Sequence, residues 1–225
     1  MQTIIRVART LNRRFPGLPP LLILTDAARA PSAAFNLGHL PPGCAVIFRD
    51  YEAPDRAGRA AALRRQCRPN RIKLLIAGDP ALALAVGADG VHWPEHQIPA
   101  APRAWAPATR PHPDWLITAA AHSHAALVRA ALAGADAALL SPVLATKSHP
   151  AARPLGPLRF TALTRAAALP VYALGGMTDA TAQRLSASGA AGLAGIGFAK
   201  LASPSLTHSP WGYNRTAPSA RDAGR

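Results

Sequence analysis

The chain has 225 residues, of which 49 % are hydrophobic but only 5 % aromatic, so its core must be built from alanine, leucine, valine and isoleucine. This length suits one α/β barrel domain or two small domains. No apolar run reaches the ~20 residues that a membrane helix needs, and the first ten residues carry no secretory signal, so we expect a cytoplasmic protein without a membrane partner.

Basic residues are in large excess. The formal net charge is +14, with 25 lysine and arginine residues against 11 aspartate and glutamate residues. The arginines are scattered along the chain and are not interleaved with aromatic residues, which argues against nucleic acid as a partner. We attribute the excess mainly to a compositional bias toward alanine and arginine. A phosphorylated small molecule is the partner that such a charge also favours.

Short apolar runs that end in polar residues recur along the chain and predict strands buried on both faces. They begin after residues 1–20, a basic segment ending in prolines that we expect to form an N-terminal extension. The expected strands are Leu21–Leu24, Ala45–Phe48, Lys73–Ile76, Gly90–His92, Trp115–Ala120, Ala137–Leu140, the apolar first half of Pro170–Asp179, and Ala191–Ile196.

Between these runs, segments rich in alanine and leucine predict helices. Asp79 is placed to cap one helix, with Pro80 as its first residue, and Ser123 opens another that Gly134 closes. Residues 98–113 are rich in proline and predict an irregular connection, and residues 203–225 predict a disordered tail. The expected helices are Asp55–Arg68, Ala81–Val86, Ala125–Ala133, Pro157–Ala168 and Asp179–Ser188.

About eight strands that alternate with helices predict an α/β fold of the closed (β/α)8, or TIM, barrel type, in a single domain over residues 21–202. Functional residues of such a barrel lie where the strands end. We therefore expect Arg49, Asp79, His92 and the loop Ser141–Pro150 to share one rim of the barrel.

Glycine turns follow the last two expected strands. Gly175 and Gly176 precede Thr178, which is suited to cap a helix, and Ile196 and Gly197 repeat the pattern. A strand, a glycine turn and a helix start together present backbone N–H groups at the positive end of a helix dipole, which suits a phosphate. An ordinary strand-to-helix turn is the alternative that the sequence leaves open.

A series of short motifs recurs in a fixed order from about Leu21 to about Leu201: Leu24-Thr25-Asp26, Arg49, Asp79, Gly87-Ala88-Asp89-Gly90-Val91-His92, Ala121-His122-Ser123, Gly134-Ala135-Asp136, Ser141-Pro142-Val143 with Thr146, and Ala173-Leu174-Gly175-Gly176. In this order the motifs resemble thiamine phosphate synthase and its sister group, the thiazole tautomerases. The resemblance implies a (β/α)8 barrel that couples hydroxymethylpyrimidine diphosphate to thiazole phosphate, releases diphosphate and requires Mg²⁺.

The resemblance also implies roles for single residues. Gly175 and Gly176, with Ile196 and Gly197, match the backbone that binds the thiazole phosphate. The matches on the rest of the rim are Arg49 for the arginine after the second strand, Thr146 and Ser148 for the hydroxyl residues of the sixth loop, and Asp79 for the magnesium aspartate.

The diphosphate side departs from the family pattern. A glutamine, a lysine, a serine and a second lysine of the family are replaced by Ile47, Tyr51, Ala120 and His149. The second magnesium carboxylate falls at Gln97, with Glu95 as the nearest substitute, and Lys147 lies two residues before His149. Charged contacts are worth about 1.5–3 kcal/mol each, so their loss is expected to weaken diphosphate binding.

Three functions follow as hypotheses. The first, which we take as the expected function, is a divergent synthase with Mg²⁺ at Asp79 and Glu95. The second is a tautomerase in which His122 or His149 replaces the family's histidine, whose position holds Pro142. The third is a barrel that binds a thiazole or thiamine phosphate without catalysis.

For two rim residues the sequence leaves two alternative roles open. Asp79 is a helix cap or a metal ligand, and Arg49 binds an anion or pairs with Asp26 or Asp50.

Overall fold

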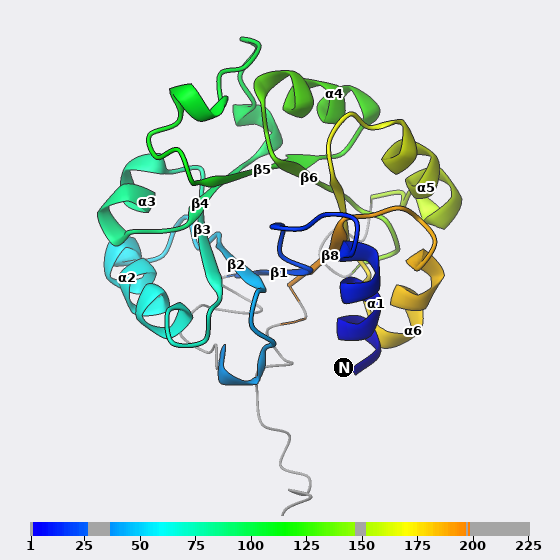
Figure 1. Ribbon diagram of the computed structural model, residues 1–225, viewed down its shortest axis with the longest axis horizontal. Helices are drawn as coiled ribbons and strands as arrows, with labels where there is room; N and C mark the ends of the chain where they lie inside the picture. Colours follow the sequence, from blue (N-terminus) through cyan, green and yellow to red (C-terminus); the bar gives the residue numbers. More distant parts are fainter. Residues whose placement is uncertain (1, 27–36, 147–151, 197, 199–225) are drawn as a thin grey trace, which may run out of the picture.

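The computed structural model describes residues 2–26, 37–146, 152–196 and 198. Eight short parallel strands close a barrel in chain order, and the last strand pairs with the first. The predicted (β/α)8 barrel is therefore confirmed (Figure 1). The strands are β1 Leu21–Leu24, β2 Ala45–Phe48, β3 Lys73–Ala77, β4 Gly90–Trp93, β5 Leu116–Ala121, β6 Ala137–Leu140, β7 Val171–Leu174 and β8 Gly192–Gly195.

Helices form a ring outside the strands (Figure 1). The α-helices are α1 Gln2–Asn12, α2 Arg56–Cys67, α3 Pro80–Val86, α4 His124–Ala133, α5 Gly156–Ala166 and α6 Asp179–Ala182. Short 3₁₀ turns are η2 Leu37–His39, η3 Glu95–Gln97, η4 Pro107–Thr109 and η5 Gln183–Leu185. The prediction of one helix over Asp179–Ser188 was wrong, because the α-helix ends after four residues and continues as a tighter 3₁₀ turn. The predicted tail, residues 203–225, lies outside the described residues.

Alternate strand residues face the inside and the outside of the barrel, as the two-residue period of a strand requires. Outward residues such as Ile23, Val46 and Leu74 belong to one cluster with the apolar faces of the surrounding helices. The inward residues form a second cluster, in which alanines sit beside large side chains. Inward members are Leu22, Leu24, Ala45, Ile47, Leu75, Ala77, Leu116, Ala137, Leu139, Tyr172 and Ala194.

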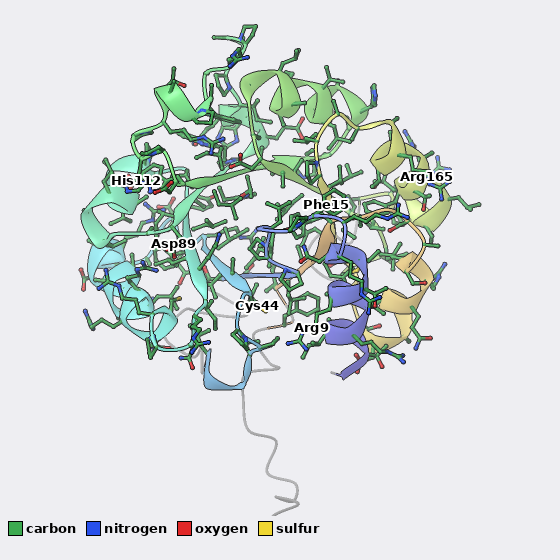
Figure 2. All side chains as sticks on the ribbon, viewed as in Figure 1. Arg9, Phe15, Cys44, Asp89, His112 and Arg165 are labelled. Atoms are coloured by element: carbon green, nitrogen blue, oxygen red, sulfur yellow. The ribbon has the colours of Figure 1, made fainter. Side chains whose placement is uncertain are left out.

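The N-terminal segment covers the end of the barrel where the strands begin. Helix α1 packs against β8 and α6, and Phe15 and Leu18, which follow it, pack against the inward cluster. Figure 2 shows Phe15 within the ring of helices. The buried hydroxyl of Tyr172 donates a hydrogen bond of 2.6 Å to the carbonyl of Pro19, so a strand near the chain's end holds this cover in place.

Paired aspartates and arginines close the same end. Asp89, just before β4, accepts hydrogen bonds from the Leu74 N–H at 2.7 Å and from Arg64 at 2.6 Å. Asp136, just before β6, accepts from the Ile117 N–H at 2.7 Å and from Arg110 at 2.8 Å. Each carboxylate thus satisfies a backbone donor of a neighbouring strand while an arginine neutralises its charge.

None of the helices in the described part of the chain combines the length and the apolar character needed to cross a bilayer.

The bond between Tyr172 and Pro19 predicts a stability effect. Tyr172→Phe leaves a buried carbonyl without its donor, which we expect to lower the free energy of unfolding by about 1–3 kcal/mol. Urea unfolding followed by circular dichroism measures this loss. Tyr51→Phe is the matched control, because the Tyr51 side chain is 45 % exposed and its change should stay within about 0.5 kcal/mol. Equal effects of the two substitutions would contradict the prediction.

Candidate functional site

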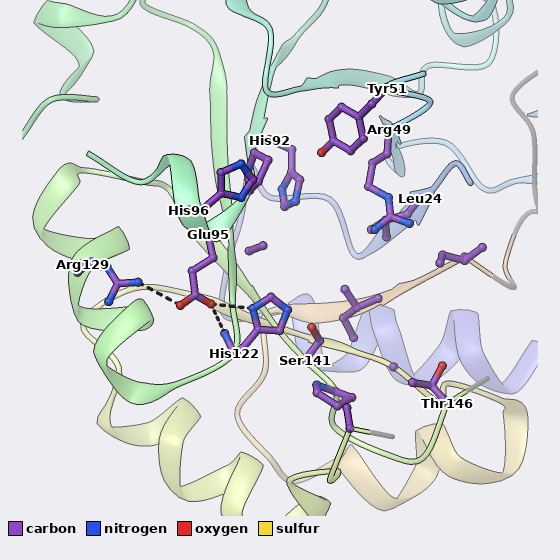
Figure 3. Close-up of a pocket in the computed structure, with 17 residues that line it drawn as sticks. Leu24, Arg49, Tyr51, His92, Glu95, His96, His122, Arg129, Ser141 and Thr146 are labelled. Carbon is purple, nitrogen blue, oxygen red and sulfur yellow. Dashed lines mark hydrogen bonds and ion pairs between the residues drawn. The ribbon is translucent and has the colours of Figure 1, made fainter. Parts of the chain in front are cut away.

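A pocket of about 530 Å³ opens at the ends of the strands. Its volume suits a small heterocyclic ligand, and its wall is mostly apolar with a few converging polar groups. Figure 3 shows these side chains reaching the pocket from several strand ends. The predicted site residues that line it are Arg49, Glu95, His122, Thr146, Gly175 and Ile196.

Arg49 follows β2 and is fixed on the pocket wall by the strand beside it. Its backbone N–H donates to the Thr25 hydroxyl at 2.7 Å, and its Nε donates to the Thr25 carbonyl at 3.2 Å. The guanidinium lies 3.7 Å from the Asp26 carboxylate. Of the two roles expected from the sequence, pairing with Asp26 is present, and the Arg49 side chain also lines the pocket.

His92 lies on β4 and is buried, with only 4 % of its surface exposed, yet it forms part of the pocket wall. Its Nδ1 is 2.9 Å from the Thr118 hydroxyl on β5. Burial, assisted by the positive charge of Arg49, lowers the pKa of His92 to about 3. The imidazole is therefore neutral at physiological pH, and a ligand meets it as a hydrogen-bonding group without charge.

Glu95, His122 and Arg129 form a hydrogen-bonded group on one side of the pocket (Figure 3). One Glu95 oxygen accepts from the His122 backbone N–H at 2.8 Å and is 2.7 Å from Nδ1 of the same residue. The other oxygen accepts from Arg129 at 3.0 Å. Burial acts to raise the pKa of Glu95, but the hydrogen bonds from His122 and Arg129 outweigh it, so the net pKa is lowered. An ionised Glu95 only accepts, so His122 donates to it through Nδ1, and in the neutral form of the ring Nε2 is the acceptor.

The glycine turn after β7 is packed too closely for side chains. Gly175 and Gly176 have φ angles of 101° and 70°, and a Cβ on Gly176 would lie 2.6 Å from the carbonyl oxygen of Ala145. Thr178 and Thr181 cap the following helix reciprocally, and the Thr181 hydroxyl also donates to the Gly176 carbonyl at 2.7 Å. Because α6 is only four residues long, backbone groups of the turn matter more here than a helix dipole.

Asp79 caps helix α3, as one reading of the sequence expected. One carboxylate oxygen accepts from the Leu82 N–H at 2.8 Å, and the other accepts from Arg56 at 2.7 Å. Asp79 is not among the residues that line the pocket. The predicted pair of magnesium ligands, Asp79 and Glu95, is therefore engaged by protein cations, and the described residues contain no group of three His, Cys, Asp or Glu side chains suited to a metal. These carboxylates do not fit a magnesium site as they stand.

Four predicted site residues lie outside the described residues: Lys147, Ser148, His149 and Gly197. Two residues that matter to the rim were not singled out from the sequence. Arg129 lies on α4 and follows His122 by seven residues, about two helical turns, so the spacing could have placed it on the side of α4 that faces His122, which lies just before the helix. Arg56 gave no such signal, because its partner Asp79 lies 23 residues further along the chain.

The fold and the pocket define a (β/α)8-barrel protein with its site at the carboxyl ends of the strands, where the functional sites of such barrels lie. A family model described as thiamine monophosphate synthase (TMP-TENI) matches residues 39–198. The chain belongs to this family.

Relatives and a solved structure agree with this assignment. The thiamine-phosphate synthase of Methanoculleus marisnigri is 37 % identical over 177 residues, which are 76 % of this chain and 78 % of that protein. The thiamine biosynthesis bifunctional protein ThiM/ThiE of Symbiobacterium thermophilum is 36 % identical over 85 % of this chain, which spans only 38 % of that longer protein. Thiamine phosphate pyrophosphorylase from Pyrococcus furiosus has the same fold, with a TM-score of 0.64 at 24 % identity over 77 % of this chain and 83 % of that one.

The lowered pKa of His92 predicts a pH dependence of stability. The unfolded chain takes up this proton near pH 6.5, whereas the folded protein does so only near pH 3. Between these values the unfolded state binds more protons, so His92 lowers the free energy of unfolding as the pH falls, by up to about 1.4 kcal/mol per pH unit. His92→Asn removes this contribution, and we expect a shallower pH dependence below pH 6.5 in urea unfolding.

His124→Gln is the control for this experiment, because His124 is an exposed histidine on α4. We expect it to leave the pH dependence unchanged. A slope in His92→Asn that equals the slope of the unmodified protein would contradict a buried, neutral imidazole.

Proposed function

We propose that this protein is a thiamine-phosphate synthase, a transferase that joins hydroxymethylpyrimidine diphosphate to thiazole phosphate in the cytoplasm. The observation that carries the proposal is the closely packed Gly175–Gly176 turn at the edge of the pocket. Family membership and a relative of 37 % identity named thiamine-phosphate synthase support it.

The glycine turn and the end of β8 are proposed to hold the phosphate of the thiazole substrate. Backbone N–H groups of Gly175, Gly176, Ile196 and Gly197 would bind it, and only glycine permits so close an approach at the first two positions. Thr146 lines the pocket beside this turn and would contact the thiazole, together with Ser148 and Lys147. A phosphate held there directs the ring into the apolar part of the pocket.

The opposite wall would receive the pyrimidine diphosphate. In the coupling step the bond between the pyrimidine methylene carbon and the diphosphate oxygen breaks, and diphosphate leaves with the electron pair. The thiazole nitrogen then donates its lone pair to that carbon and forms the new carbon–nitrogen bond. Arg49 on the wall, with His149, is proposed to stabilise the negative charge that develops on diphosphate. We assign no step to Mg²⁺, because Asp79 and Glu95 are held by arginines.

The dyad of Glu95 and His122 favours a second candidate, an isomerase of the thiazole tautomerase type. Glu95 fixes the ring through Nδ1 and leaves Nε2 as a base on the pocket wall. Such a group can take a proton from one ring position and return it to another. This activity would require no metal and no diphosphate.

One set of assays separates the candidates. With both substrates, the purified full-length protein should release diphosphate in amounts that match the thiamine phosphate formed. If thiazole tautomers interconvert without diphosphate release, and His122→Asn abolishes this conversion, the isomerase replaces the synthase. Binding of thiazole phosphate without either reaction would leave a non-catalytic barrel.

The glycine turn gives a sharper prediction for binding. Gly176→Ala places a methyl group against the Ala145 carbonyl and shifts the turn, so we expect the affinity for thiazole phosphate in calorimetry to fall about tenfold or more. Gly189→Ala is the control, because Gly189 also has a positive φ but a Cβ there meets nothing within 4 Å. We expect a small loss of stability from the control and unchanged affinity. Equal affinities in both variants would remove the turn from the binding site.

A further inference from the structure

Arg56 crosses from helix α2 to the ends of β2 and β3. Its Nη1 donates to the Asp79 carboxylate at 2.7 Å, and its Nη2 donates to the carbonyl of Ala77 at 2.8 Å. The guanidinium carbon lies 5.6 Å from the ring centroid of Phe48 and 5.7 Å from that of Tyr51. Only 18 % of the side chain is exposed, so two hydrogen bonds and two aromatic rings hold a mostly desolvated cation in one position.

Both carboxylate oxygens of Asp79 accept hydrogen bonds. Arg56 donates to one of them, and the Leu82 N–H donates to the other, which caps α3. A divalent cation at Asp79 would have to displace the guanidinium or lie beside it. An arginine does not lose its proton in proteins, so a second cation beside it is repelled.

Tyr51 separates this pair from the pocket. Tyr51 lines the pocket, whereas Arg56 and Asp79 do not. Tyr51 stands where the resemblance places a lysine, so this position has lost a charge at the pocket wall. The charge of Arg56 lies directly behind the tyrosine ring. A ligand in the pocket therefore meets an aromatic side chain backed by a fixed cation.

We propose that Arg56 is a built-in cation that takes the place of a metal ion at Asp79, and that it holds Tyr51 as a wall of the pocket. Asp79 then serves the fold, as a cap and as the partner of Arg56, and binds no divalent cation. Glu95, engaged by His122 and Arg129, offers no second carboxylate for a metal. The proposal does not depend on turnover, because its tests measure metal binding and stability.

Binding of Mn²⁺, followed by electron paramagnetic resonance of the free ion, is the first test. The full-length protein and Asp79→Asn are titrated with and without inorganic diphosphate. Asparagine retains the helix cap, so the variant should fold. We expect the two proteins to bind Mn²⁺ equally under each condition. A Mn²⁺ affinity that is at least tenfold higher in the unmodified protein would overturn the proposal.

The second test is a double-mutant cycle on the urea midpoint with Arg56→Gln, Asp79→Asn and the combined variant. If the main role of both side chains is to pair with each other, each single substitution lowers the urea midpoint. The double substitution then lowers it by clearly less than the sum of the two single shifts. Arg65→Gln, an exposed arginine on the same helix, should leave the midpoint unchanged and combine additively with Asp79→Asn. Additive effects of Arg56→Gln and Asp79→Asn would overturn the proposal.

Discussion

The barrel depends on hydrogen bonds between backbone groups at the ends of its very short strands and carboxylates that are in turn paired with arginines. Each strand has only four to six residues, so a large share of its N–H and C=O groups lies at an end. Asp89 and Asp136 supply acceptors for neighbouring strands, and Arg64 and Arg110 neutralise them. Unpaired carboxylates at these partly buried positions would be costly. Part of the arginine excess therefore has a structural role, in addition to the compositional bias inferred from the sequence.

The same rule explains the rim around the pocket. Asp79 is matched by Arg56, and Glu95 by Arg129 and His122. The two arginines that reach these carboxylates, Arg56 and Arg129, come from helices α2 and α4, which lie outside the barrel. A rim whose carboxylates are already neutralised by the protein gives a metal ion little to bind. The groups that remain to contact a ligand are arginine, imidazole and hydroxyl groups. Among them, the imidazole of His92 is kept neutral by burial.

Local chemistry determined which elements the sequence could predict. The strands were recognisable because each is an apolar run with polar residues at its end, and α3 and α4 because Asp79 and Ser123 are strong caps that the structure uses. Helix α6 was overestimated, because helical spacing continues beyond the point where the backbone tightens to η5. The contact between Arg56 and Asp79 was invisible in the sequence, since it depends on how far α2 stands from β3. Burial of His92 likewise depends on the closed barrel around it.

The two halves of the site differ in how much of them the sequence can identify. The thiazole phosphate side is proposed to bind through backbone groups, and it is specified by residues that have no side chain, so Gly175 and Gly176 are readable as a pattern. The side proposed for diphosphate consists of side chains, whose roles depend on distance and charge. There the same family position can hold a lysine, or a tyrosine with an arginine behind it, as Tyr51 and Arg56 do here. By its sequence motif, position 51 has lost a lysine. In the structure a cation is nevertheless close to this position, because the Arg56 guanidinium lies over the Tyr51 ring.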